Sequence, residues 1–267
     1  MTAPSGRYPS ATWRGSANHW DGHGKRLAVV VHINEGGFES SIKYMRDNGT
    51  SAHFEVGRDG RIAQLVDLGD SAWCNGLSFD RPSSTWICPH GKRVAPTWLL
   101  LRPEDGNPNR NTISLENEGF SGQPMPEAQF NANVELLVYA ARQYPTLAPY
   151  VVGSTLIGHA YLDTVCKRRC PGSGVDLAAL ADAANAALGL SDVWIATWQA
   201  KGVPLPIDQV GWAISKAYRA QYRALGACLA PETYVHPGLS IAVFDGGYIV
   251  YTKASGAAVV TLGPVVS

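Results

Sequence analysis

The sequence predicts an α/β fold, in which a mixed central β-sheet is flanked by helices, followed by a small C-terminal subdomain of helices and strands. Residues 27–33 form a nearly continuous apolar run, which is typical of a strand buried on both faces. Residues 126–144 and 175–188 carry apolar side chains at the spacing of a core-facing helix. Strands that alternate with helices in this way indicate a layered α/β domain.

Length and charge restrict the classes of function. The chain has 267 residues, with 22 basic and 22 acidic side chains and a formal net charge of zero. A balanced charge argues against bulk electrostatic binding to nucleic acid or to an anionic membrane. Residues 1–7 lack the apolar core of a secretory signal, and no run approaches the roughly 20 apolar residues of a membrane span. We therefore expect a soluble chain, without membrane insertion, that is made in the cytoplasm.

The N-terminal part starts irregularly and then builds the sheet. Residues 1–26 are rich in Gly, Ser, Arg and His and predict an irregular arm. The strand at 27–33 follows, and residues 39–48 predict a short helix. Residues 51–66 alternate on both sides of Asp59-Gly60, which indicates a hairpin with a primed turn. This hairpin should extend the sheet.

A long loop and two further strands complete the first domain. Residues 72–110 are rich in proline and predict a loop, which either lines a groove or forms a packed surface insertion. Residues 112–119 alternate like a strand and place Glu116 and Glu118 on one face. The apolar residues 150–152 predict a short buried strand.

The composition changes toward the C-terminus, and we expect a domain of residues 1–190 followed by one of residues 191–267. Residues 193–202 and 208–225 predict two helices, and residues 239–260 have the glycine-punctuated pattern of β structure. The second domain is therefore expected to combine helices with a small sheet.

Candidate metal ligands follow two of the predicted strands. His32 lies at the end of the first apolar run, and His159 and Cys170 lie in a segment after residues 150–152. Two imidazoles and a thiolate suit Zn²⁺, which takes three protein ligands at catalytic sites and leaves a fourth position to water. Cys166 could instead form a disulfide or redox pair with Cys170. His32 alone would be a core histidine by default.

Five fragments of the chain occur in a recognisable order. They are residues 30–32, 51–65, 72–76 and 111–119, and Gly158-His159 followed by Cys170-Pro171-Gly172. Together they resemble the zinc-dependent N-acetylmuramoyl-L-alanine amidase family that is shared by bacteriophage lysins and peptidoglycan recognition proteins. The resemblance implies that residues 1–190 form a zinc amidase catalytic domain.

The resemblance also implies roles for particular residues. The family's three zinc ligands fall on His32, His159 and Cys170, and Cys166 remains an alternative third ligand. Glu116 matches the carboxylate that acts as general base in many members. Arg168 matches a position where relatives often carry Lys, whose charge stabilises the oxyanion of the intermediate. The implied reaction is hydrolysis of the amide bond between N-acetylmuramic acid and L-alanine of the stem peptide by zinc-activated water.

Other positions extend the family pattern or depart from it. We expect His53, Trp73 and Asn75 to contact the substrate, although a structural hydrogen bond explains His53 equally well. Cys74 stands where relatives often carry His, which makes a substrate contact at that position uncertain. Ala52 stands where some phage amidases carry a catalytic Tyr, so this chain would depend on Glu116 instead.

The leading functional hypothesis is a peptidoglycan hydrolase, in particular a bacteriolytic phage or prophage endolysin that is stored in the host cytoplasm and acts on the cell wall after release. Peptidoglycan is the expected partner, nucleic acid is not expected to bind, and a monomer is expected. The alternative is a non-catalytic peptidoglycan-binding protein on the same fold. Cys170 favours catalysis, because a purely binding relative does not need a third zinc ligand.

The C-terminal domain weakly resembles an LGFP repeat, a short β unit of actinobacterial cell-wall proteins. The residues that carry this resemblance are Leu225-Gly226-Ala227, Glu232, residues 242–251 and Ser255-Gly256-Ala257. The resemblance implies a domain that binds the cell wall. A packing subdomain or an oligomer contact is the other interpretation, because repeat units rarely occur as single copies.

Overall fold

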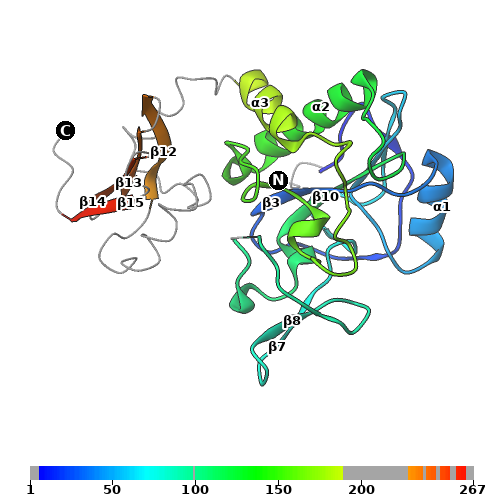
Figure 1. Ribbon diagram of the computed structural model, residues 1–267. Coiled ribbons are helices and arrows are strands. Elements are labelled where there is room, and N and C mark those ends of the chain that lie inside the picture. Colours follow the sequence, from blue (N-terminus) through cyan, green and yellow to red (C-terminus); the bar gives the residue numbers. More distant parts are fainter. Residues whose placement is uncertain are drawn as a thin grey trace, which may run out of the picture. The chain divides into compact units, whose positions relative to one another are not determined.

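The chain divides into two compact units, Met1–Gly189 and Leu190–Ser267, in the computed structural model shown in Figure 1. The structure describes residues 6–98 and 100–188, together with four strands between residues 228 and 262. The two units have separate sheets. No helix in the described part of the chain is long and apolar enough to span a membrane.

A six-stranded mixed sheet forms the centre of the first unit, as the sequence predicts. Its strands are β1 (Thr12–Trp13), β3 (Ala28–Val31), β4 (Phe54–Val56), β5 (Ile62–Gln64), β10 (Thr112–Asn117) and β11 (Leu156–Gly158). They lie in the order β1-β5-β4-β10-β3-β11, and each neighbouring pair is parallel except the hairpin of β4 and β5. Every residue of β3 is fully buried, which explains its continuous apolar sequence.

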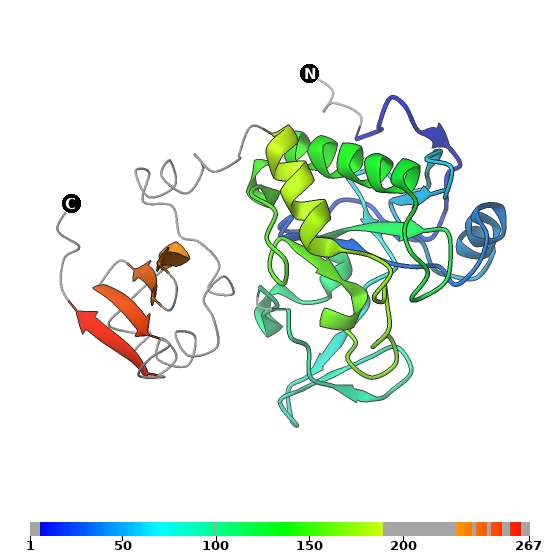
Figure 2. The same ribbon diagram turned by 45° about the horizontal axis from the view of Figure 1, so that its top comes forward.

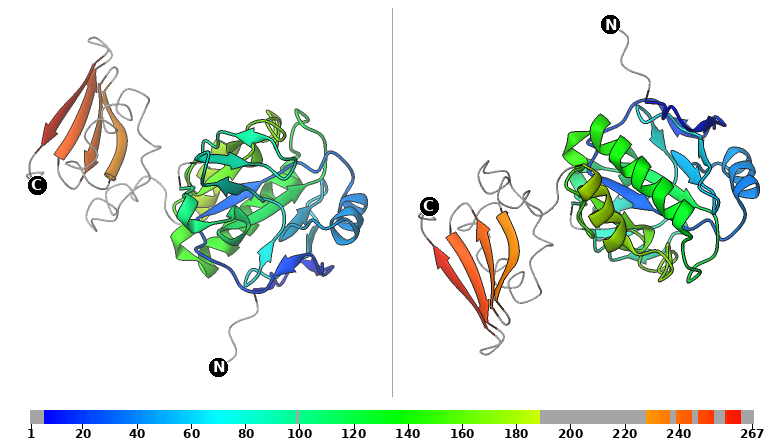
Figure 3. Two further views of the ribbon diagram at one scale, coloured as in Figure 1. Left: turned by 90° about the horizontal axis from the view of Figure 1, so that it is seen from below. Right: turned by 90° about the horizontal axis from the view of Figure 1, so that it is seen from above.

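Two helices cover one face of this sheet. α2 (Glu127–Gln143) and α3 (Leu177–Ala187) lie side by side on it, as Figures 2 and 3 show. Leu137 of α2 and Leu180 of α3 share a core cluster with Val29 and Ile113 of the sheet. A third helix, α1 (Phe38–Asp47), packs Ile42 against the region around β5. The three helices predicted in this unit are therefore confirmed.

The segment predicted as a long loop, residues 72–110, instead contains a small antiparallel sheet. Its strands are β7 (Ser78–Asp80), β8 (Thr85–Ile87) and β9 (Arg93–Val94), and β7 and β8 project from the unit in Figure 1. Phe79 and Trp86 pair across β7 and β8, with ring centroids 5.1 Å apart. Strands of two or three residues leave too few alternating positions for the sequence pattern to reveal them.

This insertion covers the second face of the central sheet. Alternation along β3 sends Val29 and Val31 toward the helices and Ala28 and Val30 to the opposite side. There, Ala28 and Val30 join a separate apolar cluster that includes Trp98 of the insertion. The centre of the sheet is thus enclosed on both faces. Polar side chains that bind a ligand would therefore lie at the ends of its strands.

The turn of the β4–β5 hairpin differs from the predicted primed turn. The amide of Gly60 donates to the carbonyl of Gly57 at 2.9 Å, so Arg58 and Asp59 are the central residues. Among these four residues only Gly60 has a positive φ, of 86°, whereas a type I′ turn needs positive φ at both central residues. A non-primed turn followed by a left-handed glycine therefore closes the hairpin.

Two other local predictions are wrong in detail. The residues predicted as a strand, 150–152, form only an isolated bridge between Val152 and Leu156. A turn over residues 153–155 follows, and the strand beside β3 begins only at Leu156. The N-terminal arm is partly ordered into strands. β1 pairs with β5, and β2 (His19–Trp20) pairs with β6 (Ser71–Ala72).

The second unit contains a four-stranded antiparallel sheet in sequence order. Its strands are β12 (Cys228–His236), β13 (Leu239–Phe244), β14 (Gly247–Thr252) and β15 (Ala257–Leu262). β13, β14 and β15 agree with the β structure predicted for residues 239–260, whereas β12 precedes that range and was not predicted. The helices predicted at 193–202 and 208–225 lie outside the described residues.

Candidate active site

Three polar side chains meet at the carboxyl ends of three neighbouring parallel strands. Val31 of β3 pairs with Leu115 of β10 on one side and with Gly158 of β11 on the other. The next residues along these strands are His32, Glu116 and His159. The His32 amide continues the register by donating to the Leu115 carbonyl at 2.8 Å. Functional side chains of α/β sheets gather at this kind of edge.

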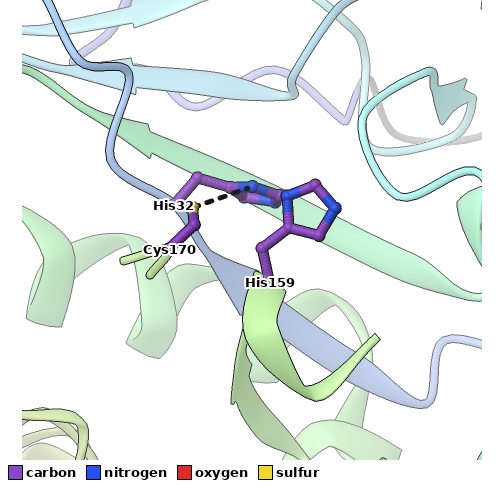
Figure 4. A group of neighbouring side chains, drawn as sticks. All are labelled: His32, His159 and Cys170. Atoms are coloured by element: carbon purple, nitrogen blue, oxygen red, sulfur yellow. Dashed lines mark hydrogen bonds between the residues drawn. The ribbon is translucent and has the colours of Figure 1, made fainter. Parts of the chain in front are cut away.

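Cys170 reaches the same edge from the loop that follows β11. Its Sγ lies 3.9 Å from His32 Nδ1, and the Ile33 amide donates to the same sulfur at 3.4 Å. Figure 4 shows this thiol beside the rings of His32 and His159. Gly158 permits the approach, since a Cβ there would lie 2.4 Å from Cδ of Pro171. The glycine before His159 therefore has a steric reason, which is the close packing of the segment that carries Cys170.

His32, His159 and Cys170 have the geometry expected of metal ligands, and the two histidines also have the expected protonation. One ligand atom of each lies within 4.8 Å of the others, and the two ring centroids are 4.5 Å apart. Burial lowers the pKa of His32 well below its usual value and lowers the pKa of His159 to about 4. Both imidazoles are therefore neutral near pH 7, and each can offer a lone pair. Burial raises the pKa of the Cys170 thiol to about 12, so the thiolate needs a cation beside it.

Asn75 supports the ring of His32. Its side-chain amide nitrogen donates to Thr112 Oγ1 at 2.9 Å and to Ser114 Oγ at 2.8 Å, which fixes the side chain. Its hydrogen bonding tends to raise the pKa of His32, against the larger effect of burial. A metal-bound histidine usually donates its second ring N–H to an oxygen of a neighbouring group, and Oδ1 of Asn75 is buried without another partner among the described residues. Asn75 is 1% exposed, so it lies behind a candidate ligand, away from the substrate contact that we predicted.

Glu116 is the carboxylate of this cluster. Its Oε1 accepts a hydrogen bond from the Cys74 thiol at 3.3 Å and lies 3.8 Å from His32 Nδ1. Its Oε2 is buried and has no hydrogen-bond partner among the described residues. Burial raises the pKa of Glu116 to about 7, although the Cys74 hydrogen bond and the charge of Lys167 oppose the rise. A carboxyl group with this pKa can both accept and release a proton near neutral pH. Glu118 differs, because both its oxygens accept hydrogen bonds from backbone amides.

The charge of Lys167, one position before the predicted Arg168, reaches the cluster. The charge of Lys167 lowers the pKa of His32, His159 and Glu116. Arg168 is exposed, and its role at the oxyanion stays a prediction. Three consecutive cations occupy residues 167–169, and sequence spacing does not determine which of them turns toward the site.

His53 does not face the site. It is fully buried, and both of its ring nitrogens contact the backbone: the Ser114 amide donates to Nδ1 at 3.0 Å, and Nε2 lies 3.1 Å from the Asp70 carbonyl. The ring has no nitrogen left for a substrate, so the structural alternative explains this residue. Trp73 is half-buried and packs on Trp20 with ring centroids 5.5 Å apart. Its substrate contact stays a prediction.

Cys74 lies within the cluster, although the sequence marked it only as a departure from the family pattern. Its Sγ is 3.8 Å from His32 Nδ1, and it belongs to a second group of close ligand atoms with His32 and Glu116. The only sequence signal was its place in the fragment 72–76, between two residues predicted to contact substrate. A single cysteine in that context does not reveal which neighbour its side chain meets.

Cys166 lies in a different environment from Cys170. Its Sγ is 3.4 Å from the Sγ of Cys88 in the insertion, and these two thiols form a separate cluster with Asp163. The structure therefore places Cys170, and not Cys166, beside His32. The predicted alternative of a Cys166–Cys170 pair finds no support in this geometry.

The candidate site lies within the region that matches a known protein family. Residues 23–173 match the family described as Amidase_2, N-acetylmuramoyl-L-alanine amidase. The chain belongs to this amidase family. The matched region begins before β3 and ends just after Cys170. It therefore contains the whole strand-end cluster, which consists of His32, Glu116, His159 and Cys170. No curated protein sequence matches the chain.

Solved structures of amidases and related proteins are similar to this amidase domain. A selenomethionine AmpD derivative is 21% identical, with a TM-score of 0.48, over 67% of this chain and 99% of that protein. AmpDh3 from Pseudomonas aeruginosa, in complex with anhydromuramic pentapeptide, is 21% identical, with a TM-score of 0.45, over 68% and 71% of the two chains. The endolysin amidase LysCS from Clostridium intestinale is 13% identical, with a TM-score of 0.41, over 70% and 99%.

Proposed function

We propose that this amidase is zinc-dependent and hydrolyses the amide bond between N-acetylmuramic acid and L-alanine of the peptidoglycan stem peptide. The observation that carries the proposal is the meeting of two neutral imidazoles and a thiol beside a buried carboxyl group, at the ends of adjacent strands. Nitrogen and sulfur donors of this kind suit zinc. His32, His159 and Cys170 would hold the ion.

The surrounding residues have complementary tasks in this reaction. Bound zinc would polarise the scissile carbonyl and lower the pKa of a water molecule. Glu116 has an unpaired oxygen, Oε2, with which it can take a proton from the attacking water and later pass it to the leaving nitrogen of L-alanine. Lys167, whose positive charge reaches the cluster, would stabilise the negative charge that develops on the carbonyl oxygen.

Product analysis tests this proposal. Purified peptidoglycan is digested with the full chain, with and without a chelator, and the soluble products are identified by mass. We expect free stem peptides that begin with L-alanine, formed only when metal is present. Binding to the wall without any release of peptide would instead support the non-catalytic alternative. Sugar fragments that still carry the peptide would assign a different bond.

We further propose that the enzyme acts on the cell wall as a phage or prophage endolysin. The family membership and the resemblance of the sequence to phage lysins support this role. To test this role, the purified chain is added in separate assays to living cells and to isolated walls of the same bacteria. An endolysin should lyse isolated walls readily, and lysis from within should follow when a membrane-permeabilising protein is expressed together with it.

The second unit is proposed to bind the cell wall. Its antiparallel sheet and the resemblance to an LGFP repeat support this role. Deletion of residues 191–267 should weaken sedimentation of the protein with insoluble walls, while hydrolysis of a small soluble muropeptide continues. Unchanged sedimentation of the shortened protein would refute the assignment.

A further inference from the structure

Two thiols lie in contact outside the strand-end cluster. The Sγ atoms of Cys88 and Cys166 are 3.4 Å apart. A disulfide bond joins its two sulfurs at about 2.0 Å, so the two atoms need to close a gap of only about 1.4 Å. Rotation of each sulfur about its Cα–Cβ bond is sufficient for a shift of this size. The pair is therefore placed for a covalent bond to form.

We propose that Cys88 and Cys166 are a cross-linking site, at which the two thiols form a disulfide bond by exchange with a small-molecule disulfide. The Cys166 thiolate attacks the small disulfide and releases one half of it as a thiol. The Cys88 thiolate then attacks the sulfur of Cys166 and releases the other half. Two protein thiols are thus oxidised, one small disulfide is reduced to two thiols, and the protons of the protein thiols end on these products.

The burial of the two cysteines sets the order of these steps. Cys166 is half-buried and can be reached from solvent, whereas Cys88 is only 3% exposed. A small disulfide therefore reacts with Cys166 first, and Cys88 reacts with the mixed disulfide that results. Because the buried thiol already touches the accessible one, the adduct should resolve to the internal bond.

Backbone hydrogen bonds hold both cysteines beside each other. The backbone of Cys88 takes part in two hydrogen bonds of the turn between β8 and β9, and the Cys166 amide donates to Asp163 Oδ1 at 2.7 Å. The two segments also meet nearby, where the Thr97 amide donates to the Tyr161 carbonyl at 2.8 Å. The folded chain has little freedom left to lose when the bond forms, so the bond restricts mainly the unfolded chain.

A metal ion explains this cluster less well. Its carboxylate, Asp163, already accepts hydrogen bonds at Oδ1 from the amides of Val165 and Cys166. The group of close ligand atoms has three members among the described residues, whereas structural zinc sites have four protein ligands. The direct contact of the two sulfurs favours the covalent bond.

The bond would enclose a large part of the first unit. Positions 88 and 166 are 78 residues apart, and β10, α2 and β11 lie between them. A cross-link over a loop of this length should raise the Tm by about 5–15 °C. It would also tie the insertion to the segment that carries His159 and Cys170, without using either of these side chains.

Disulfide exchange tests the site in the full chain, in the presence of zinc. Reduced protein is incubated with oxidised glutathione and digested without reductant, and linked peptides are identified by mass. Contact with Cys88 raises the pKa of the Cys166 thiol, so the exchange is run at about pH 9, where more of the thiol is ionised. We expect a peptide pair joined through Cys88 and Cys166, and a rise in Tm that a reductant reverses.

Two variants provide the test and its control. Cys166→Ser should give no linked peptide and the same Tm with and without oxidised glutathione. Cys228→Ser, which removes a cysteine of the second unit, should keep both the linked peptide and the rise in Tm. The comparison of wild type before and after oxidation needs no variant, in case Cys166→Ser does not fold.

Three outcomes would overturn the proposal. A glutathione adduct that stays on Cys166 would show that Cys88 does not react with it. Equal Tm values of linked and reduced protein would contradict a stabilising cross-link. A second zinc ion, bound by reduced wild type and lost in Cys166→Ser, would make the cluster a metal site instead. None of these readouts depends on amidase activity, so each of these outcomes leaves the proposed function in place.

Discussion

Among the described residues, the first unit combines cysteine with a carboxylate both at the strand ends and in the insertion, and the two clusters differ in how their polar atoms are satisfied. In the insertion cluster of Cys88, Asp163 and Cys166, the thiols contact each other and Asp163 Oδ1 accepts hydrogen bonds from two backbone amides. In the strand-end cluster of His32, Glu116, His159 and Cys170, Oε2 of Glu116 is buried without a hydrogen-bond partner among the described residues.

The comparison suggests what distinguishes a reactive site from a structural one. A buried polar atom without a partner costs roughly 1–3 kcal/mol, a cost that a bound group can offset. The insertion cluster is complete as it stands and ties the insertion to the segment after β11. In the proposed mechanism, a metal ion and a substrate would complete the strand-end cluster.

The largest effect should come from removing a ligand in each cluster. Cys170→Ala should lose both bound zinc and wall-lytic activity, because two imidazoles alone hold the ion weakly. Cys166→Ala should keep both, since its sulfur contacts Cys88. Metal analysis of the purified proteins, followed by a wall-lysis assay, checks the pair. Normal zinc content in Cys170→Ala would mean that the strand-end cluster is not the metal site.

The next largest effect should come from the carboxylates. Glu116→Gln should keep zinc but lower turnover by roughly 10²–10⁴, the usual contribution of a general base. Asp163→Asn should retain most activity, because the amide oxygen can still accept the backbone hydrogen bonds that Asp163 receives. Turnover of a soluble muropeptide measures both variants. Full activity of Glu116→Gln would assign the proton transfer to another group.

A smaller difference in turnover should appear between variants of the adjacent cations Lys167 and Arg168. Lys167→Met should lower turnover by about tenfold, less than the loss of a fixed oxyanion donor, because its side chain is exposed and its charge is screened by water. Arg168→Met should have little effect. Raising the salt concentration should reduce the difference between Lys167→Met and wild type. A larger loss of turnover in Arg168→Met than in Lys167→Met would instead support the prediction that Arg168 stabilises the oxyanion.

The smallest effect should come from Glu55, whose replacement should change the pH dependence of the thermal stability. Glu55 is buried like Glu116, but its two oxygens accept hydrogen bonds from Asn34 and Ser41. Burial raises the pKa of Glu55 well above its usual value, and the charge of Glu116 adds to the rise. At pH values between the unfolded and the folded pKa of Glu55, the folded state therefore retains a proton on this carboxyl group that the unfolded state releases. Stability is greatest below the unfolded pKa and falls as pH rises through the folded pKa.

Glu55→Gln should remove this fall, because glutamine does not ionise and the Ser41 hydroxyl can accept from its amide. We expect the Tm of the variant to exceed that of wild type by a few degrees at about pH 8 and to equal it at about pH 4. Calorimetry over this range measures the difference. A constant difference in Tm at all pH values would show that the carboxyl group is not protonated in the folded state.

Much of this arrangement could be predicted from the sequence, for reasons that are visible in the fold. The apolar run before His32 indicates a strand buried on both faces, and parallel strands bring their carboxyl ends to one edge of the sheet. His32, Glu116 and His159 meet there because Val31, Leu115 and Gly158 are in register. Register and strand ends follow from hydrophobic pattern and topology, which the sequence encodes locally.

The parts that could not be predicted depend on side-chain direction in irregular segments. Lys167 and Arg168 are adjacent in a turn, and no periodicity determines which of them faces the cluster. Cys74 and Asn75 are also adjacent, yet the thiol of Cys74 faces His32 whereas the side-chain amide of Asn75 donates to Thr112 and Ser114. His53 matched a family fragment, but its ring is used by the backbone.

The location of zinc in crystals of the full chain is the most direct test of this account. Anomalous diffraction recorded at the zinc edge would mark the ion independently of any activity. We predict one strong peak enclosed by His32, His159 and Cys170, with Glu116 beside it. A peak between Cys88 and Cys166, or none at the strand ends of zinc-loaded protein, would contradict the assignment of the strand-end cluster as the catalytic centre.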